Sequence, residues 1–142
     1  MKIKILTLLF VIGFGFLTSC NNDDDNSTQD KTISGTWNLK NVSGGLQGVN
    51  VNYSRGDVKW SFSQTNNTLI VENNVTTEPK VIYAGFDSGT YNYEIQQGAN
   101  NQILFIDEIE SGGIILNEFF ILDQNIIMSG SGADGFVFKF ER

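Results

Sequence analysis

The segment Asp57-Val58-Lys59-Trp60-Ser61-Phe62-Ser63-Gln64 alternates apolar and polar side chains with a period of two residues. Successive side chains of a β-strand point to opposite faces of the sheet, so the pattern predicts a strand with Val58, Trp60 and Phe62 on its buried face. A second segment of this kind ends the chain, over residues 135–141. Strands with one apolar and one polar face are typical of antiparallel sheets.

Similar segments recur along residues 33–142 at intervals of about 8 to 15 residues, and no stretch has convincing helical periodicity. The pattern predicts strands over 35–42, 57–64, 68–73, 80–84, 90–96, 102–107, 114–122, 126–130 and 135–141. Short turns join most of them, and residues 43–56, rich in Gly, Asn and Ser, make the one long connection. Consecutive hairpins form a meander, and closure of a meander removes exposed edges. We therefore expect an all-β, antiparallel up-and-down barrel of about eight or nine strands.

Gly35-Thr36-Trp37 opens the first predicted strand and resembles the Gly-x-Trp hallmark of lipocalins. Trp60-Ser61-Phe62, Gly89-Thr90-Tyr91 and the Phe-rich segment 136–142 follow in order. Together these motifs resemble the small lipocalin-like domains of Bacteroidetes-type lipoproteins, over nearly all of residues 33–142.

The resemblance implies roles for individual residues. Trp37 would plug one end of the barrel, and Arg142 is the candidate for the late Arg that covers this plug in larger lipocalins. The implied function is a cavity for a small apolar molecule. By strand parity, six aromatic residues would line that cavity: Trp60, Phe62, Tyr91, Tyr93, Phe138 and Phe140.

The same six side chains have a simpler interpretation as core. The interior of an eight-stranded barrel is either filled by side chains or just wide enough for one small ligand. The predicted strands are short and their inward residues are bulky, which favours a filled interior. A usable pocket is the alternative.

One part of the chain breaks the two-residue alternation, because apolar residues occur on both faces of neighbouring strands. The segments concerned are 103–106, 114–116, 119–122 and 126–128. An open antiparallel face would carry polar residues, so something should cover this one. The candidates are residues 43–56 of this chain, a second copy in a homodimer, or a protein partner, each docking on strands 102–128.

Composition excludes several kinds of chemistry. The chain has 142 residues, no His and one Cys, which removes His acid–base catalysis, His-activated nucleophiles and Cys or His metal clusters. Asp107, Glu108 and Glu110 form an acidic cluster, of which only Glu108 and Glu110 could share a strand face. Nothing else marks a sugar-cleaving site, so we expect no enzyme, no catalytic residue, no metal and no cofactor.

The first 19 residues have the organisation of a secretory signal peptide. Lys2 and Lys4 precede an apolar run of about 13 residues, which is short for a helix that spans a membrane. The run ends in Leu17-Thr18-Ser19-Cys20, which resembles the lipobox of bacterial lipoproteins. This resemblance implies cleavage between Ser19 and Cys20 and acylation of Cys20.

Residues 20–32 are polar and acid-rich, which predicts a flexible tether between the lipid and the barrel domain of residues 33–142. Removal of Lys2 and Lys4 with the leader would leave 7 basic and 16 acidic residues, a net charge of −9 against −7 for the whole chain. Such a charge disfavours nucleic-acid binding. Asn21 after the Cys is compatible with an outer-membrane lipoprotein, facing the periplasm or the cell surface.

The sequence thus favours a lipid-anchored envelope protein that binds a small apolar ligand or a protein partner without catalysis. An accessory or structural envelope lipoprotein with a filled barrel is the alternative.

The apolar outer face leads to a first prediction. Replacing one outward residue of strands 102–128 by Lys should change the assembly of the protein, because a charge cannot be buried in an apolar contact without a large cost. Light scattering reports the particle size, and an unchanged size would count against an interface there.

Overall fold

The computed structural model describes residues 32–126 and 134–142 as nine strands and one short helix. The strands are β1 (Gly35–Gly44), β2 (Val49–Asn52), β3 (Val58–Ser63), β4 (Thr68–Asn73), β5 (Gly89–Gln97), β6 (Gln102–Ile106), β7 (Ile109–Leu116), β8 (Phe120–Asp123) and β9 (Phe136–Glu141). The helix α1 spans Lys80–Tyr83. The predicted leader, Ser19 and Cys20, and the tether up to residue 31 lie outside the described residues, as do residues 127–130 of the strand predicted over 126–130.

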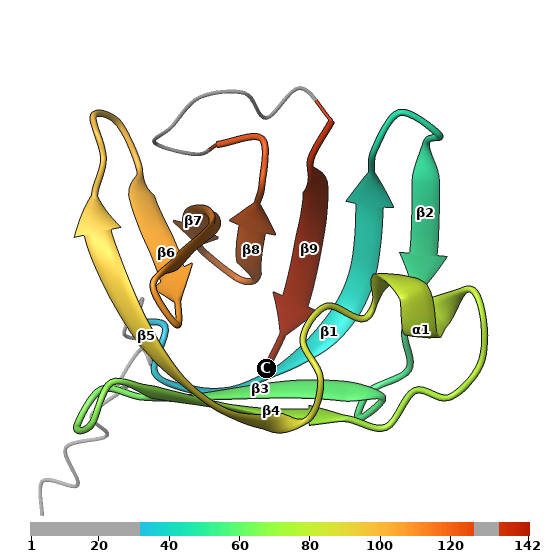
Figure 1. The fold of residues 1–142 in the computed structure, drawn as a ribbon, viewed down its shortest axis with the longest axis horizontal. Coiled ribbons are helices and arrows are strands. Elements are labelled where there is room, and N and C mark those ends of the chain that lie inside the picture. Colours follow the sequence, from blue (N-terminus) through green and yellow to red (C-terminus); the bar gives the residue numbers. More distant parts are fainter. Residues whose placement is uncertain (1–31, 127–133) are drawn as a thin grey trace, which may run out of the picture.

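The strands form one antiparallel barrel, which confirms the predicted lipocalin-like meander (Figure 1). From β3 to β9 each strand pairs with the next one in the sequence, and β9 returns to pair with β1. β1 also pairs with β3, so eight strands close the barrel and β2 is an extra one.

β1 can serve both β3 and β9 because it is long and irregular. Its pairing with β9 shifts register between Leu39 and Asn41, and Lys40 is the extra residue. Such a bulge bends a strand and changes which side chains point inward. The buried apolar residues are accordingly Trp37 and Leu39 before the bulge and Val42 after it, which is not a strict alternation.

The prediction of one long connection over residues 43–56 is wrong, because the middle of this segment is β2, which forms a hairpin with the second half of β1. Its turn is closed by a hydrogen bond from Gly48 N to Gly45 O of 3.0 Å. β2 pairs with the second half of β1, and β3 pairs with its first half. The turn from Ser54 to Asp57 separates β2 from β3. The alternation of Val and Asn within Val49–Asn52 is the sequence pattern that could have predicted β2.

The strand predicted over 80–84 is also wrong, because this segment contains α1. Tertiary contacts decide its conformation: the Lys80 ammonium lies 2.9 Å from Asp57 Oδ2, and the Tyr53 hydroxyl donates to Lys80 O at 2.8 Å. Val81 and Ile82, which suggested a buried strand, are exposed. α1 lies next to β2 at the rim of the barrel (Figure 1).

The long strand predicted over 114–122 is two strands, β7 and β8, separated by a turn at Asn117 in which Asn117 N donates to Phe119 O at 3.0 Å. β7 also begins earlier, directly after a two-residue turn. Asp107 and Glu108 adopt left-handed φ values of 46° and 68° there, so Glu108 is a turn residue and does not share a strand face with Glu110.

Aromatic rings fill most of the barrel. The Trp60 ring lies 4.8 Å from that of Phe140 and 6.4 Å from that of Phe120, and Phe120 stacks on Phe140 at 5.0 Å between centroids. All three are at most 1% exposed. Burial of rings of this size supplies the largest apolar contribution to the stability of the fold.

The ion pair that fastens α1 leads to a prediction about pH. The hydrogen bond from Lys80 to Asp57 lowers the pKa of the Asp57 carboxyl below its ordinary value. The pair therefore stabilises the fold at neutral pH, and this contribution is lost as the pH falls from the ordinary Asp pKa of about 4 through the lower folded-state pKa. Asp57→Asn should therefore lower the free energy of unfolding at pH 7 by less than about 1 kcal/mol, since the pair is partly exposed.

Urea unfolding at several pH values measures this difference, with Glu118→Gln at an exposed turn as the control. The difference between Asp57→Asn and the unsubstituted protein should shrink towards zero at low pH. A difference that stays constant from pH 7 to pH 2.5 would contradict the assignment.

Candidate ligand site inside the barrel

The six aromatic residues predicted to line a cavity all come from strands of the barrel, but the structure does not bring all six to one cavity. Trp60, Phe62, Tyr93, Phe138 and Phe140 are buried, and Tyr91 is half-buried. Phe62 and Tyr93 pack edge to face at 5.1 Å between centroids, within the filled part of the core. Only Trp60 and Phe138 of the six line the cavity described next.

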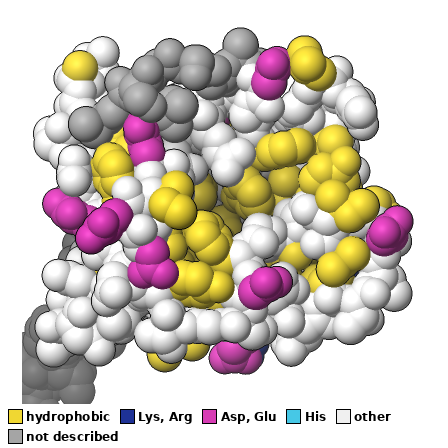
Figure 2. Space-filling view, viewed as in Figure 1, with side chains coloured by type: hydrophobic (Ala, Val, Ile, Leu, Met, Phe, Trp, Pro, Cys, Tyr) yellow, Lys and Arg dark blue, Asp and Glu magenta, His cyan; other side chains and the backbone are white. Residues whose placement is uncertain are grey.

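This cavity lies beside the aromatic core and has a volume of about 140 Å³. Its lining comes from β3, the segment after α1, β7, the end of β8 and β9, and consists of Trp60, Gly85, Phe86, Ile109, Glu110, Ser111, Leu122, Gln124 and Phe138. Figure 2 shows the hollowed face, where hydrophobic side chains gather around the depression and acidic side chains lie around them.

One wall is the segment that follows α1. Ala84 is 1% exposed, and the Phe86 ring packs on Trp60 at 5.7 Å and on Tyr91 at 5.2 Å. Gly85 has a φ of +83°, and a Cβ there would lie 3.6 Å from Phe138 Cε1 and 3.7 Å from Trp60 Cζ2. The backbone therefore passes directly over both rings, and Gly85 itself is exposed at the mouth.

The facing wall depends on an irregularity in β7. Leu104 pairs with Gly112 but Phe105 pairs with Glu110, which leaves Ser111 as the extra residue of a β-bulge. A bulge turns a side chain that would otherwise follow the strand alternation. Ser111 is only 7% exposed, and its hydroxyl donates to Ile109 O at 3.1 Å.

Gly112 makes this bulge possible. It has a φ of +146°, and a Cβ at this position would lie 2.9 Å from Asp123 O, closer than real Cβ atoms approach backbone. The sequence prediction missed Ser111, although a Ser followed by two Gly residues in an apolar strand is a recognisable bulge signal.

The cavity wall contains a few polar residues, namely Ser111, Gln124 and Glu110. The Trp60 ring contributes to the same wall, but its indole nitrogen is buried. Within residues 32–126 and 134–142, Trp60 Nε1 is the one buried side-chain nitrogen or oxygen without a hydrogen-bond partner.

The predicted plug residues meet away from this cavity. The Arg142 guanidinium lies 4.3 Å from the Trp37 ring centroid and donates to Thr32 O at 2.8 Å and to Ser34 O at 3.2 Å. Trp37 Nε1 donates to Ile33 O at 2.7 Å, so this second indole is paired. Arg142 thus holds the segment before β1 across the Trp37 ring.

The apolar outer face of β6 to β8 is covered in part by the chain itself. Ile103 is 2% exposed, and Ile126 packs so closely on β7 that a Cβ at Gly113 would lie 2.6 Å from its Cβ. Lys139 Nζ lies 3.8 Å above the Phe119 ring. Residues 43–56, expected as a possible cover, lie along β1 instead, and Ile115 keeps 41% exposure.

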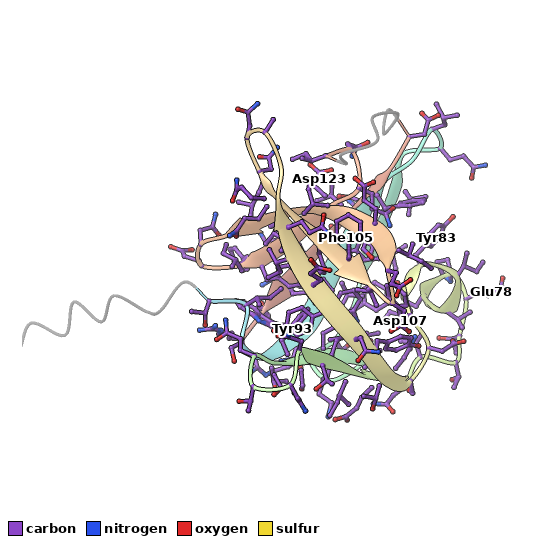
Figure 3. All side chains as sticks on the ribbon, turned by 60° about the vertical axis from the view of Figure 1, so that its left-hand side comes forward. Glu78, Tyr83, Tyr93, Phe105, Asp107 and Asp123 are labelled. Atoms are coloured by element: carbon purple, nitrogen blue, oxygen red, sulfur yellow. The ribbon has the colours of Figure 1, made fainter. Side chains whose placement is uncertain are left out.

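A larger groove of about 890 Å³ follows β5 and the end of β6. It is lined mainly by polar residues that water reaches, including Asn92, Glu94 and Asp107, with Tyr93 and Phe105 as its aromatic part. Figure 3 shows Phe105 and Asp107 on this side; Tyr83 belongs to α1, and Glu78 lies just before it. Exposed polar walls offer a ligand little gain from burial, so the smaller cavity is the stronger candidate.

In the described part of the chain, no group of three or more Cys, Asp or Glu side chains is arranged to hold a metal ion. Over the same residues, no helix is long and apolar enough to cross a membrane. No protein-family model matches the chain, and no curated protein or solved structure resembles it significantly.

Proposed function

We propose that the chain is a lipid-anchored protein of the bacterial cell envelope whose barrel binds one small, largely apolar molecule and catalyses no reaction. The observation that carries the binding role is the cavity between the aromatic core and the segment after α1, with Trp60 and Phe138 as its floor and Gly85 at its mouth.

The size of the cavity defines what it would hold. A dry apolar cavity of about 150 Å³ accepts a molecule the size of benzene. At about 140 Å³ the cavity suits a compact molecule of that size. Long acyl chains are poor candidates, because Phe120, Phe140 and Phe62 occupy the space that such a chain would need.

Location and attachment rest on the sequence. The lipobox-like Leu17-Thr18-Ser19-Cys20 and the acidic tether after it support acylation of Cys20 and an outer-membrane position. Several acyl chains on one residue would give stable anchoring where a single chain would not. The alternative is an accessory envelope protein that binds a partner through the outer face around Ile115 and leaves the cavity unused.

Replacing Cys20 tests the anchor. Cys20→Ala should abolish incorporation of a labelled fatty acid and release the protein from the membrane fraction, because the thiol that receives the lipid is gone. Ser27→Ala in the tether is the control and should change neither. Undiminished labelling of Cys20→Ala would contradict the proposal.

Titration with toluene tests the cavity. Toluene should produce saturable ¹H–¹⁵N shift changes at Gly85, Phe86 and Ser111, because these residues line the cavity that it would enter. Leu122→Phe should weaken this binding roughly tenfold or more by occupying the same space. Leu116→Phe is the matched control, since Leu116 packs against the core but does not line the cavity.

The pattern of shifts decides between the two roles. Toluene shifts that are absent, or that survive Leu122→Phe undiminished, would overturn binding in the cavity. The accessory role would then be the better account of the fold.

A further inference from the structure

We propose that this cavity binds the methylated ammonium group of a small organic cation, such as a trimethylammonium group. The inference rests on the proposed binding function and deepens it, because it defines the chemical class of the ligand. Methyl groups cover the nitrogen of such a cation, so its surface is largely apolar although it carries a charge. A trimethylammonium group is about as bulky as benzene and therefore fits a volume of about 140 Å³.

Aromatic rings make up much of the cavity wall. Phe86, Phe138 and Trp60 are three of its nine lining residues. Trp60 is almost fully buried, so the ring surface that a ligand can reach belongs mainly to Phe86, which is half-buried, and to Phe138, which keeps 8% exposure. The electron-rich faces of aromatic rings attract cations, and pockets with several rings are the usual binding sites of methylated ammonium groups.

Gly85 leaves these rings accessible at the mouth of the cavity. A Cβ atom there would lie 3.6 Å from Phe138 Cε1 and 3.7 Å from Trp60 Cζ2, which are ordinary van der Waals contacts. A side chain at this position would therefore cover ring surface that Gly leaves free. Because Gly85 is itself exposed, a ligand can approach the aromatic wall from solvent.

The charge of the wall favours a cation. Glu110 belongs to the lining, and none of the described lining residues is Lys or Arg. At a partly buried site a carboxylate attracts a positive ligand more strongly than in bulk water, and it repels an anion equally. Acidic side chains also lie around the depression on the face that Figure 2 shows. The net charge of −7 for the whole chain adds a long-range attraction of the same sign.

The lining also decides which kind of cation is favoured. An ammonium group has three N–H donors, and each needs an acceptor once its water is removed. Most of the wall is hydrocarbon without acceptors, from Ile109, Leu122 and the aromatic residues. A trimethylammonium group has no N–H donor, so it can leave water without losing a hydrogen bond. It therefore matches apolar walls beside a carboxylate better than an unmethylated ammonium does.

Choline and 3,3-dimethyl-1-butanol provide the test. The two molecules have the same shape, but a neutral carbon in the alcohol replaces the charged nitrogen of choline. Choline should bind about tenfold more tightly than the alcohol, because only choline carries the charge that the rings and Glu110 attract. Titrations at constant ionic strength, followed by the ¹H–¹⁵N shifts of Gly85, Phe86 and Ser111, measure both affinities. Ethanolamine, which lacks the methyl groups, should bind more weakly than choline.

Two substitutions test which residues recognise the charge. Glu110→Gln removes the carboxylate, and Phe86→Leu removes one ring but keeps an apolar side chain. Each should lower the affinity for choline about fivefold relative to that for the alcohol, and the ratio is used because either change alters the site for both molecules. Glu118→Gln is the control of equal charge, since Glu118 lies in the exposed turn after β7 and does not line the cavity. It should leave the ratio unchanged.

Binding of toluene and the alcohol, with choline no tighter than the alcohol, would overturn the methylated-ammonium proposal and leave the proposed function standing. A preference for choline that neither Glu110→Gln nor Phe86→Leu reduces would overturn it too, because the charge would then be recognised elsewhere. The comparison in the unsubstituted protein gives an answer even if a variant does not fold. If toluene, choline and the alcohol all fail to bind, the proposed function itself fails.

Discussion

The position of one indole ring determines both the core and the candidate site. Trp60 lies among Phe62, Phe86, Phe120 and Phe140, with centroid distances between 4.8 and 6.4 Å. Rings at these distances attract each other beyond the gain from burial alone. This packing fixes the plane of the indole. Trp60 also forms part of the cavity wall, together with Gly85, Phe86 and Phe138.

Two departures from regular structure then build the cavity walls. The bulge at Ser111 turns a polar side chain inward, and the Gly85 backbone crosses over the Trp60 and Phe138 rings. Both depend on Gly residues with positive φ, at positions 112 and 85. The ion pair between Asp57 and Lys80 fastens the helix that leads into the second wall. The barrel provides a rigid frame, and these irregular segments give the site its shape.

The parts predicted correctly from the sequence are those that follow local alternation. Val58, Trp60 and Phe62 point into the core as their spacing predicts, and the meander follows from the succession of such strands. The parts predicted wrongly are those decided by distant contacts. The apolar side chains of residues 80–84 predict a strand, but the segment forms α1. The contacts of Tyr53 and Asp57 with Lys80 stabilise this helix.

In the candidate site too, the residues on regular strands were predicted and those in irregular segments were not. Trp60 and Phe138 were predicted as lining residues from strand parity, whereas Gly85 and Ser111 were not. No periodicity places a residue of a non-repeating segment above a ring 25 positions earlier in the chain, as Gly85 lies above Trp60. The predictions for Cys20 and the tether concern residues that the structure does not describe, and they remain predictions.

A crystal structure of the barrel purified from its own host tests the central claim most directly. The account predicts electron density for a compact organic molecule in the cavity, in contact with Trp60 and Phe138. A cavity that is filled by side chains, or that holds only water, would contradict it.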